Sequence, residues 1–330
     1  MTSRSVTWVF VVVACGARTP LGGTPSPTTP QADADVPDVA PSTIPPSNEP
    51  CDPLVFQSGG DPQASFVLAH GFLHYKAKDG VMRTPWNDAT PSPVAADVAD
   101  LFAVDGTSLF WVDAKKGYIA STPVTGGATT KGTCGAPSAC PPTVSQGSRA
   151  VGVTDAHAIT SDYANFLFSF PKNDLDADPA LLITDGPPTA LVVAFASSGE
   201  HVFWITDEYV FEVEVGVTKS VKIDDGWPSG LTIHAGDVYW TAAPQNTSRL
   251  VHRAVSGGPT NIVYTGELHD PLGANDAFVY GVSKEGIIRV DVSNGSKTVI
   301  EPKSSPKHLA VYGACVFVMD PDGLVRRLPG

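Results

Sequence analysis

Four cysteines in the body of the chain are the residues with the most readily predicted chemistry. Cys51, Cys134, Cys140 and Cys315 form an even set, separate from Cys15 near the start. In an exported chain such a set predicts two disulfides, for which three pairings exist. Cys134 and Cys140 flank only Gly-Ala-Pro-Ser-Ala, so we expect them to pair locally, which leaves Cys51 for Cys315. The alternative for Cys315 is a buried free thiol. No Cys-x-x-Cys spacing occurs, so a zinc site is not expected.

Alternating carboxylates at Asp174, Asp176 and Asp178 are weak candidates for a metal site, because calcium prefers oxygen ligands. Asp185 follows at the place of the last ligand in an EF-hand loop. However, Pro179 stands where that loop requires glycine. We therefore interpret the segment as a solvated acidic turn, and we expect no cofactor.

Four histidines, His70, His157, His201 and His234, lie near the first two strands of four repeats and would line a central channel. A metal cluster there is one interpretation, but the chain has no His-x-His or His-Glu-x-x-His spacing. We expect these side chains to be hydrogen-bonded or exposed instead. The sequence also lacks a Gly-x-Ser-x-Gly motif and a phosphate-binding loop. It therefore predicts no catalytic residue, and a binding protein is favoured over an enzyme.

The charge of the chain excludes one class of partner. Acidic residues outnumber basic ones by 34 to 21, for a net charge of −13. A nucleic-acid-binding surface is basic, so nucleic acid is not an expected partner. The same charge disfavours a polybasic membrane-binding patch.

The first residues are typical of an export signal. Arg4 precedes the apolar run Val6–Val13, which is far shorter than the roughly 20 residues that span a bilayer. Val12-Val13-Ala14-Cys15 resembles the lipobox of bacterial lipoproteins. That resemblance implies a signal peptide over residues 1–14 and a lipid on Cys15, and Gly16 in place of aspartate favours the outer membrane. The alternative is an ordinary signal peptide with a chance cysteine.

Residues 15–50 are rich in proline and poor in large apolar side chains. Such a segment buries too little surface to offset the entropy of ordering, so it predicts a disordered, extended tether. The folded domain is expected over residues 51–330.

A repeated strand pattern dominates that domain. Its clearest copies are Leu109–Val112, Val202–Ile205 and Val238–Thr241, and weaker copies begin at Phe72, His157, Phe278 and Val316. Each copy is followed by a turn and a further strand, and most by a short fourth strand. The copies recur at roughly 40 residues, which is the period of a four-stranded propeller blade. The sequence thus predicts an all-β fold, a seven-bladed β-propeller of antiparallel blades.

The two ends of the domain complement each other. The last copy stops at Gly330 after its third strand, whereas Pro53–Gly59 reads as a fourth strand without a blade. We therefore expect the N-terminal strand to close the last blade, because closure removes exposed sheet edges. Cys51 and Cys315 would then both begin strands of this blade, and Cys134 and Cys140 would lie in an insertion between the third and fourth strands of the second blade. A six-bladed ring would require discarding the copy at His157, whose flanking strands argue against that.

The strands with an aromatic–Trp pair, followed by turns such as Gly126-Gly127, resemble YWTD-like and Tol-type propellers of secreted and envelope proteins. The resemblance implies this fold and a role in binding proteins or ligands. The repeat register predicts that Trp111, Trp204 and Trp240 pack between blades. The resulting hypothesis is a monomeric binding or scaffold protein at the cell envelope, held to the membrane only by its lipid, with an unknown protein or small-molecule ligand. The alternative is a metal-dependent hydrolase or lyase with its site at the channel mouth.

Overall fold

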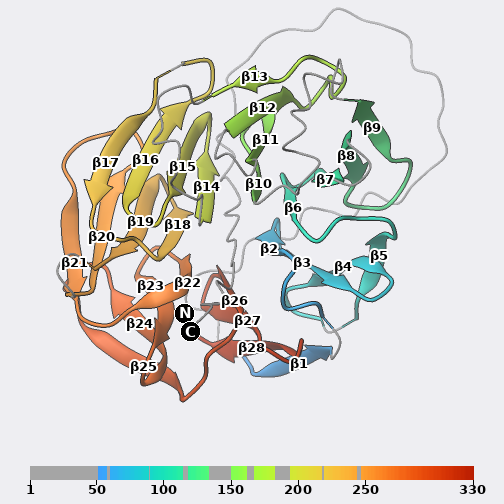
Figure 1. Cartoon of the computed structure of the whole chain (residues 1–330). Coiled ribbons are helices and arrows are strands. Elements are labelled where there is room, and N and C mark those ends of the chain that lie inside the picture. The colour runs from blue at the N-terminus through green and yellow to red at the C-terminus, as the bar shows by residue number, and fades with distance from the viewer. Residues whose placement is uncertain are drawn as a thin grey trace, which may run out of the picture.

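The folded chain is built only of β-strands in the part that its computed structural model describes, which comprises residues 51–57, 60–88, 90–113, 118–133, 150–161, 167–182, 194–217, 219–243 and 247–330. The strands form seven four-stranded antiparallel sheets. Figure 1 shows the sheets as blades around a common centre. This arrangement confirms the seven-bladed β-propeller. None of these residues belongs to a helix long and apolar enough to cross a membrane.

Each blade contributes strands A to D from the centre outward (Figure 1). The A strands are β2 (Phe66–Ala69), β6 (Phe102–Val104), β10 (Ala150–Val153), β14 (Ala194–Ser198), β18 (Gly230–His234), β22 (His269–Ala274) and β26 (His308–Tyr312). The B strands are β3 (Phe72–Ala77), β7 (Ser108–Asp113), β11 (His157–Ser161), β15 (His201–Ile205), β19 (Asp237–Ala242), β23 (Phe278–Ser283) and β27 (Cys315–Met319). The C strands are β4 (Gly80–Pro85), β8 (Tyr118–Pro123), β12 (Leu167–Pro171), β16 (Tyr209–Glu214), β20 (Arg249–Ala254), β24 (Gly286–Asp291) and β28 (Val325–Pro329). The D strands are β5 (Ser92–Ala95), β9 (Thr130–Thr133), β13 (Ala180–Leu181), β17 (Val221–Asp225), β21 (Asn261–Thr265), β25 (Lys297–Pro302) and β1 (Leu54–Gln57).

Packing near the centre explains why strands A and B differ in side-chain size. The blades converge there, and small residues of strand A stand opposite large ones of strand B, as in the pairs Ala196–Phe203 and Ala310–Phe317. Gly152 is the extreme case, since a Cβ at this position would lie 1.8 Å from the ring of Phe195 in the next blade. The small residues let neighbouring A strands approach, and the large ones fill the space between blades.

The predicted tryptophans form part of this core. Trp111 and Trp204 are 2% exposed and Trp240 is fully buried, each beside a neighbouring blade. Their packing between blades is therefore confirmed.

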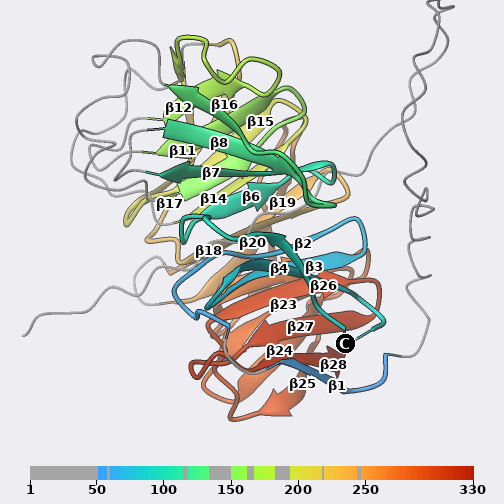
Figure 2. The same ribbon diagram turned by 90° about the vertical axis from the view of Figure 1, so that its right-hand side faces the viewer.

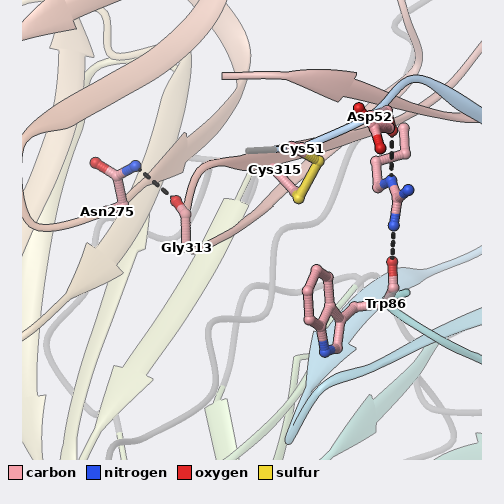
Figure 3. Close-up of a disulfide and its surroundings, with 7 residues drawn as sticks. Cys51, Asp52, Trp86, Asn275, Gly313 and Cys315 are labelled. Atoms are coloured by element: carbon pink, nitrogen blue, oxygen red, sulfur yellow. Dashed lines mark hydrogen bonds between the residues drawn. A yellow bond between two sulfur atoms is a disulfide. The ribbon is translucent and has the colours of Figure 1, made fainter. Parts of the chain in front are cut away.

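The seventh blade is completed by the N-terminal strand. β1 pairs antiparallel with β28, and the ring of Phe56 lies 5.7 Å from that of Phe317. Cys51 and Cys315 form a disulfide with their Cα atoms 5.3 Å apart, as Figure 3 shows. The closing strand and this disulfide are both confirmed.

One arginine links the closing blade to its neighbour. Arg327 of β28 is 8% exposed and donates from Nε to the carbonyl of Asp52 and from Nη1 to the carbonyl of Trp86, at 2.9 and 2.7 Å (Figure 3). Trp86 belongs to blade 1, and the A strands β2 and β26 are in contact. Side-chain hydrogen bonds and strand packing thus join blades 7 and 1.

The position predicted for the Cys134–Cys140 insertion is wrong. The fourth strand of blade 2 is β9, which ends before Cys134, so the insertion follows this strand instead of preceding it. The sequence of β9, Thr-Lys-Gly-Thr, is polar and gives no apolar signal for a strand. The pairing of Cys134 with Cys140, and the lipid on Cys15, lie outside the described residues.

Candidate functional site

The ring has two ends with different loops. We call the end that carries the A–B and C–D turns the AB end, and the opposite end, with the B–C turns and the connections from one blade to the next, the DA end. Strand β1 starts at the AB end, because it runs antiparallel to β28, which finishes there. Figure 2 shows β1 and the C-terminus near each other at this side of the molecule. The chain that precedes Cys51 therefore attaches at the AB end.

The histidines predicted near the channel lie at the A–B turns of the AB end. Nδ1 of His157 is 3.0 Å from Oε2 of Glu200 in the next blade, and Glu200 also accepts the N–H of Ala156 at 2.8 Å. Nε2 of His234 lies 2.7 Å from Oδ1 of Asp276, again in the next blade. These side chains join neighbouring blades instead of converging on one point.

The other two predicted histidines have different surroundings. Nδ1 of His201 is 3.0 Å from Oε1 of Glu212, which also accepts from Arg253 of the next blade. The ring of His70 packs on Gly106, where a Cβ would be 2.1 Å from it. The expectation that the four histidines are hydrogen-bonded or exposed therefore holds for all of them. Three have carboxylate partners, and His70 is exposed and packs on glycine.

The three aspartates weighed as metal ligands lie in the turn between β12 and β13. Asp174, Asp176 and Asp178 are exposed, whereas Leu175 between them is buried. The N–H of Ala177 donates to the carbonyl of Asp174, which forms the turn. Across the residues that the structure describes, no three His, Cys, Asp or Glu side chains are placed to hold a metal ion.

A residue outside the repeat register, Trp227, stands out at the DA end. It lies in the connection between β17 and β18, is 58% exposed, and has a positive φ of 51°. Large residues rarely adopt this backbone conformation, and where they do the surrounding structure must hold them there. Here the N–H of Ala243 donates to the carbonyl of Gly226, and Ser229 bonds through its N–H and hydroxyl to Thr241. The indole is therefore presented to solvent on a fixed loop.

Carboxylates surround this loop. Asp207 and Glu208 in the B–C turn of blade 4, and Asp225 at the end of β17, are all exposed. A hydrogen bond with Glu208, together with the charges of Glu208, Asp225 and Asp207, raises the pKa of Tyr209. The shift places these three carboxylates near one phenol. The DA end of blade 4 is thus acidic and aromatic.

A further carboxyl group lies where β22 begins. Oδ1 of Asp270 is enclosed and has no hydrogen-bond partner, and burial raises the pKa of this side chain well above its usual range. Asp270 precedes a cis peptide bond to Pro271. It packs on Gly230, three positions after Trp227, where a Cβ would lie 3.2 Å from the Cβ of Asp270.

Sequence reasoning missed both Trp227 and Asp270. The available signal for Trp227 was a large aromatic residue in the polar segment Asp225-Gly226-Trp227-Pro228-Ser229, between two strands and out of register with the repeat. Asp270 gave no signal, because its enclosure depends on Gly230 of the preceding blade.

Comparison with known proteins shows the fold. No protein-family model matches the sequence, and no curated protein is significantly similar to it. Among solved structures, the β-propeller domain of Cps50 (Swd1) from Myceliophteria thermophila has a TM-score of 0.62 at 11% identity and covers 84% of this chain and 99% of its own. The computationally designed Ika8 protein has a TM-score of 0.56 at 14% identity, over 81% of this chain and 83% of its own. BamB from Moraxella catarrhalis has a TM-score of 0.51 at 14% identity, over 84% and 86%. At these identities the similarity establishes that the chain has a β-propeller fold.

Proposed function

We propose that this chain is a lipid-anchored binding protein of the cell envelope, and that its propeller holds a partner protein at the DA end. The observation that carries the proposal is Trp227, whose large apolar side chain is exposed on a loop that backbone hydrogen bonds hold in place. Tryptophan is enriched among the few residues that supply most of the energy of protein interfaces. Because the backbone of this loop is already ordered, less entropy is lost when a partner covers the indole.

The attachment of the tether supports the same end of the ring. A chain anchored through Cys15 would enter the domain at Cys51, which lies at the AB end. Trp227 lies at the opposite end, in the connection to β18. In an anchored propeller, Trp227 therefore lies at the end opposite the point of attachment. A partner can reach the indole there.

The charge around Trp227 indicates the chemistry of the partner. Asp207, Glu208 and Asp225 are exposed beside the loop, and the whole chain carries a net charge of −13. A partner with a basic contact surface would be attracted to this end, and its association would slow as salt screens the charges.

Replacing Trp227 by alanine is expected to weaken the partner complex by tenfold or more, which is the effect of a typical interface hot spot. The tagged full chain is captured from envelope extracts under mild fixation, and the recovered partner is quantified. Val217→Ala is the matched control, because Val217 is 45% exposed in the same blade but lies in a turn of the AB end. Equal recovery with both variants would reject the DA end as the binding face.

Replacing Cys15 by serine tests the anchor separately. We expect the wild-type chain to sediment with membranes and the Cys15→Ser chain to appear in the soluble envelope fraction, since one cysteine carries the lipid. Fractionation followed by immunoblotting measures this distribution. A serine variant that stays with the membranes would refute lipid anchoring and leave the propeller's binding face untouched.

A further inference from the structure

A cavity of about 320 Å³ lies between the outer strands of blades 1 and 2, on a different part of the ring from Trp227. Residues 94–97 of blade 1 form one side, and Trp111, Gly127, Thr129 and Lys131 of blade 2 form the other. Its volume lies at the lower end of the range for small-molecule sites.

The repeat contains a filled counterpart of this cavity between blades 4 and 5. Strand pairing places Trp240 of blade 5 in the same position as Trp111 of blade 2. Nε1 of Trp240 donates to Oδ2 of Asp224 at 2.6 Å, and Nη2 of Arg249 lies 3.0 Å from Oδ1. One carboxylate, supplied by strand D of the preceding blade, therefore accepts from both an indole and a guanidinium group.

The cavity between blades 1 and 2 is bordered by equivalent hydrogen-bond donors. Trp111 is 2% exposed, and its Nε1 is enclosed without a hydrogen-bond partner. The ammonium group of Lys131 lies 4.7 Å from the centre of the Tyr118 ring. Tyr118 occupies the strand position that Arg249 occupies in blade 5. An indole N–H and a cation thus border the cavity, as they border Asp224.

The acceptor is what blade 1 lacks. β5 of blade 1 and β17 of blade 4 each pair with strand C of their own blade, with a bulge at the same position. In this register Ala95 is equivalent to Asp224. Blade 6 has Glu301 at this position, in an ion pair with Arg326 of blade 7. Blades 4 and 6 therefore supply a carboxylate to the next blade from this position, whereas blade 1 has Ala95. The cavity occupies the space that a carboxylate side chain would fill.

We propose that this cavity binds a small molecule through a carboxylate group, which takes the place of the Asp224 side chain. Its oxygens accept hydrogen bonds from Nε1 of Trp111 and Nζ of Lys131. A buried N–H without a partner destabilises its surroundings, so a ligand that supplies an anionic acceptor gains a charge-assisted bond. Asp97 also lines the cavity, but it is not the acceptor, since the N–H of Trp111 has no partner.

This site is independent of the partner-binding face at Trp227. It is tested by following the NMR signal of the Trp111 indole N–H. The isotope-labelled full chain is titrated with benzoate or hexanoate, and with the neutral benzamide or hexanamide. The indole N–H resonances of the six tryptophans are followed, with Trp111 assigned by a Trp111→Phe variant. We expect the carboxylates to shift the Trp111 resonance in a saturable manner, whereas the amides bind at least tenfold more weakly.

Matched variants test each part of the proposed contact. Ala95→Asp restores the carboxylate within the chain, so the Trp111 resonance should be shifted without ligand and should no longer respond to benzoate. Lys131→Met should weaken benzoate binding at least tenfold. Lys222→Met is the control, because Lys222 has the same strand position in blade 4 and also lies over a tyrosine, at 5.0 Å from the Tyr209 ring.

Three outcomes would overturn the proposal. The first is a Trp111 resonance that no carboxylate moves up to its solubility limit. The second is an equal response to benzoate and benzamide, and the third is an equal loss with Lys131→Met and Lys222→Met. If Ala95→Asp does not fold, Ala95→Asn takes its place and should reduce benzoate binding by filling the cavity; full binding by this variant would also contradict the site.

Discussion

Loss of the Cys51–Cys315 disulfide is expected to lower the free energy of unfolding by about 4 kcal/mol. The two cysteines are 264 positions apart, so breaking the bond restores a large conformational freedom to the unfolded chain. The bond also fixes the residues before β1 to the start of β27. Without it, β1 is held by its pairing with β28, by the packing of Leu54 and Phe56, and by the hydrogen bond from Arg327 to Asp52.

Urea unfolding of oxidised chains measures this effect. The comparison is made in a background without Cys134 and Cys140, so that only one disulfide differs, and Cys51→Ala with Cys315→Ala removes it. Adding reductant should bring the parent close to the double variant and leave the variant unchanged. A difference below about 1 kcal/mol, at the bottom of the range for disulfides, would contradict the view that this bond stabilises the ring.

The second large effect is a loss of stability in acid that depends on His74. This histidine of β3 is 2% exposed and lies in the core between blades. Burial, and secondarily the charge of Arg83, lowers its pKa to about 3, from 6.5 in the unfolded chain. Between pH 6.5 and pH 3, His74 is therefore protonated in the unfolded state and neutral in the folded state. Stability present at neutral pH is lost as the pH falls from 6.5 toward 3, by on the order of 2–3 kcal/mol at pH 4.5.

Replacing His74 by phenylalanine is expected to remove this part of the acid sensitivity. Phe110, Phe203 and Phe317 occupy the same position in other blades, so the ring fits the fold. The free energy of unfolding is measured in urea between pH 7 and pH 4.5 for both chains. The advantage of His74→Phe should grow by on the order of 2–3 kcal/mol over that interval.

A reciprocal variant provides the control. Phe110→His places a histidine in the equivalent site of blade 2, where Phe110 is 3% exposed, and should steepen the loss of stability in acid. Parallel pH curves for the wild type and His74→Phe would show that His74 does not titrate with a lowered pKa. His308, whose pKa burial lowers to about 4, contributes equally to both chains and cancels from the difference.

The ring could be predicted because its signal is repeated. The sequence contains seven copies of one strand pattern, and the last copy lacks a fourth strand. One further strand precedes the first copy. Pairing of β1 with β28 was therefore predicted. The Cys51–Cys315 bond was predicted by elimination, and the closure places both cysteines in the same blade. A repeat specifies a fold well because each copy is independent evidence for the same element.

The register within the strands was harder to predict. In the sequence, the third residue of each strand B copy was aligned, which places His74 level with Trp111, Trp204 and Trp240. In the structure, the pairing of strand B with strand A shifts this alignment by one residue. His74 is therefore equivalent to Phe110, Phe203 and Tyr239. Strand B is buried on both faces, so apolar residues follow one another without alternation, and the pattern cannot show which residue faces which blade.

The candidate sites lie where the repeat is broken, and a search for regularity does not find them. Trp227 lies in a connection between blades, and the cavity beside Trp111 exists because Ala95 replaces a carboxylate found in other blades. Neither is visible without knowing which residues of neighbouring blades face each other. Functional residues on variable loops over a regular scaffold are a common arrangement.

Site-specific photo-cross-linking tests whether a partner is bound at the end of the propeller that carries Trp227. A photoreactive phenylalanine analogue is placed at position 227, or at position 217 of the same blade, in cells that produce the full chain. A partner bound at this end gives a discrete, salt-sensitive cross-linked product from position 227 and none from position 217. Cross-linking from position 217 alone, or equally from both positions, would contradict binding at this end.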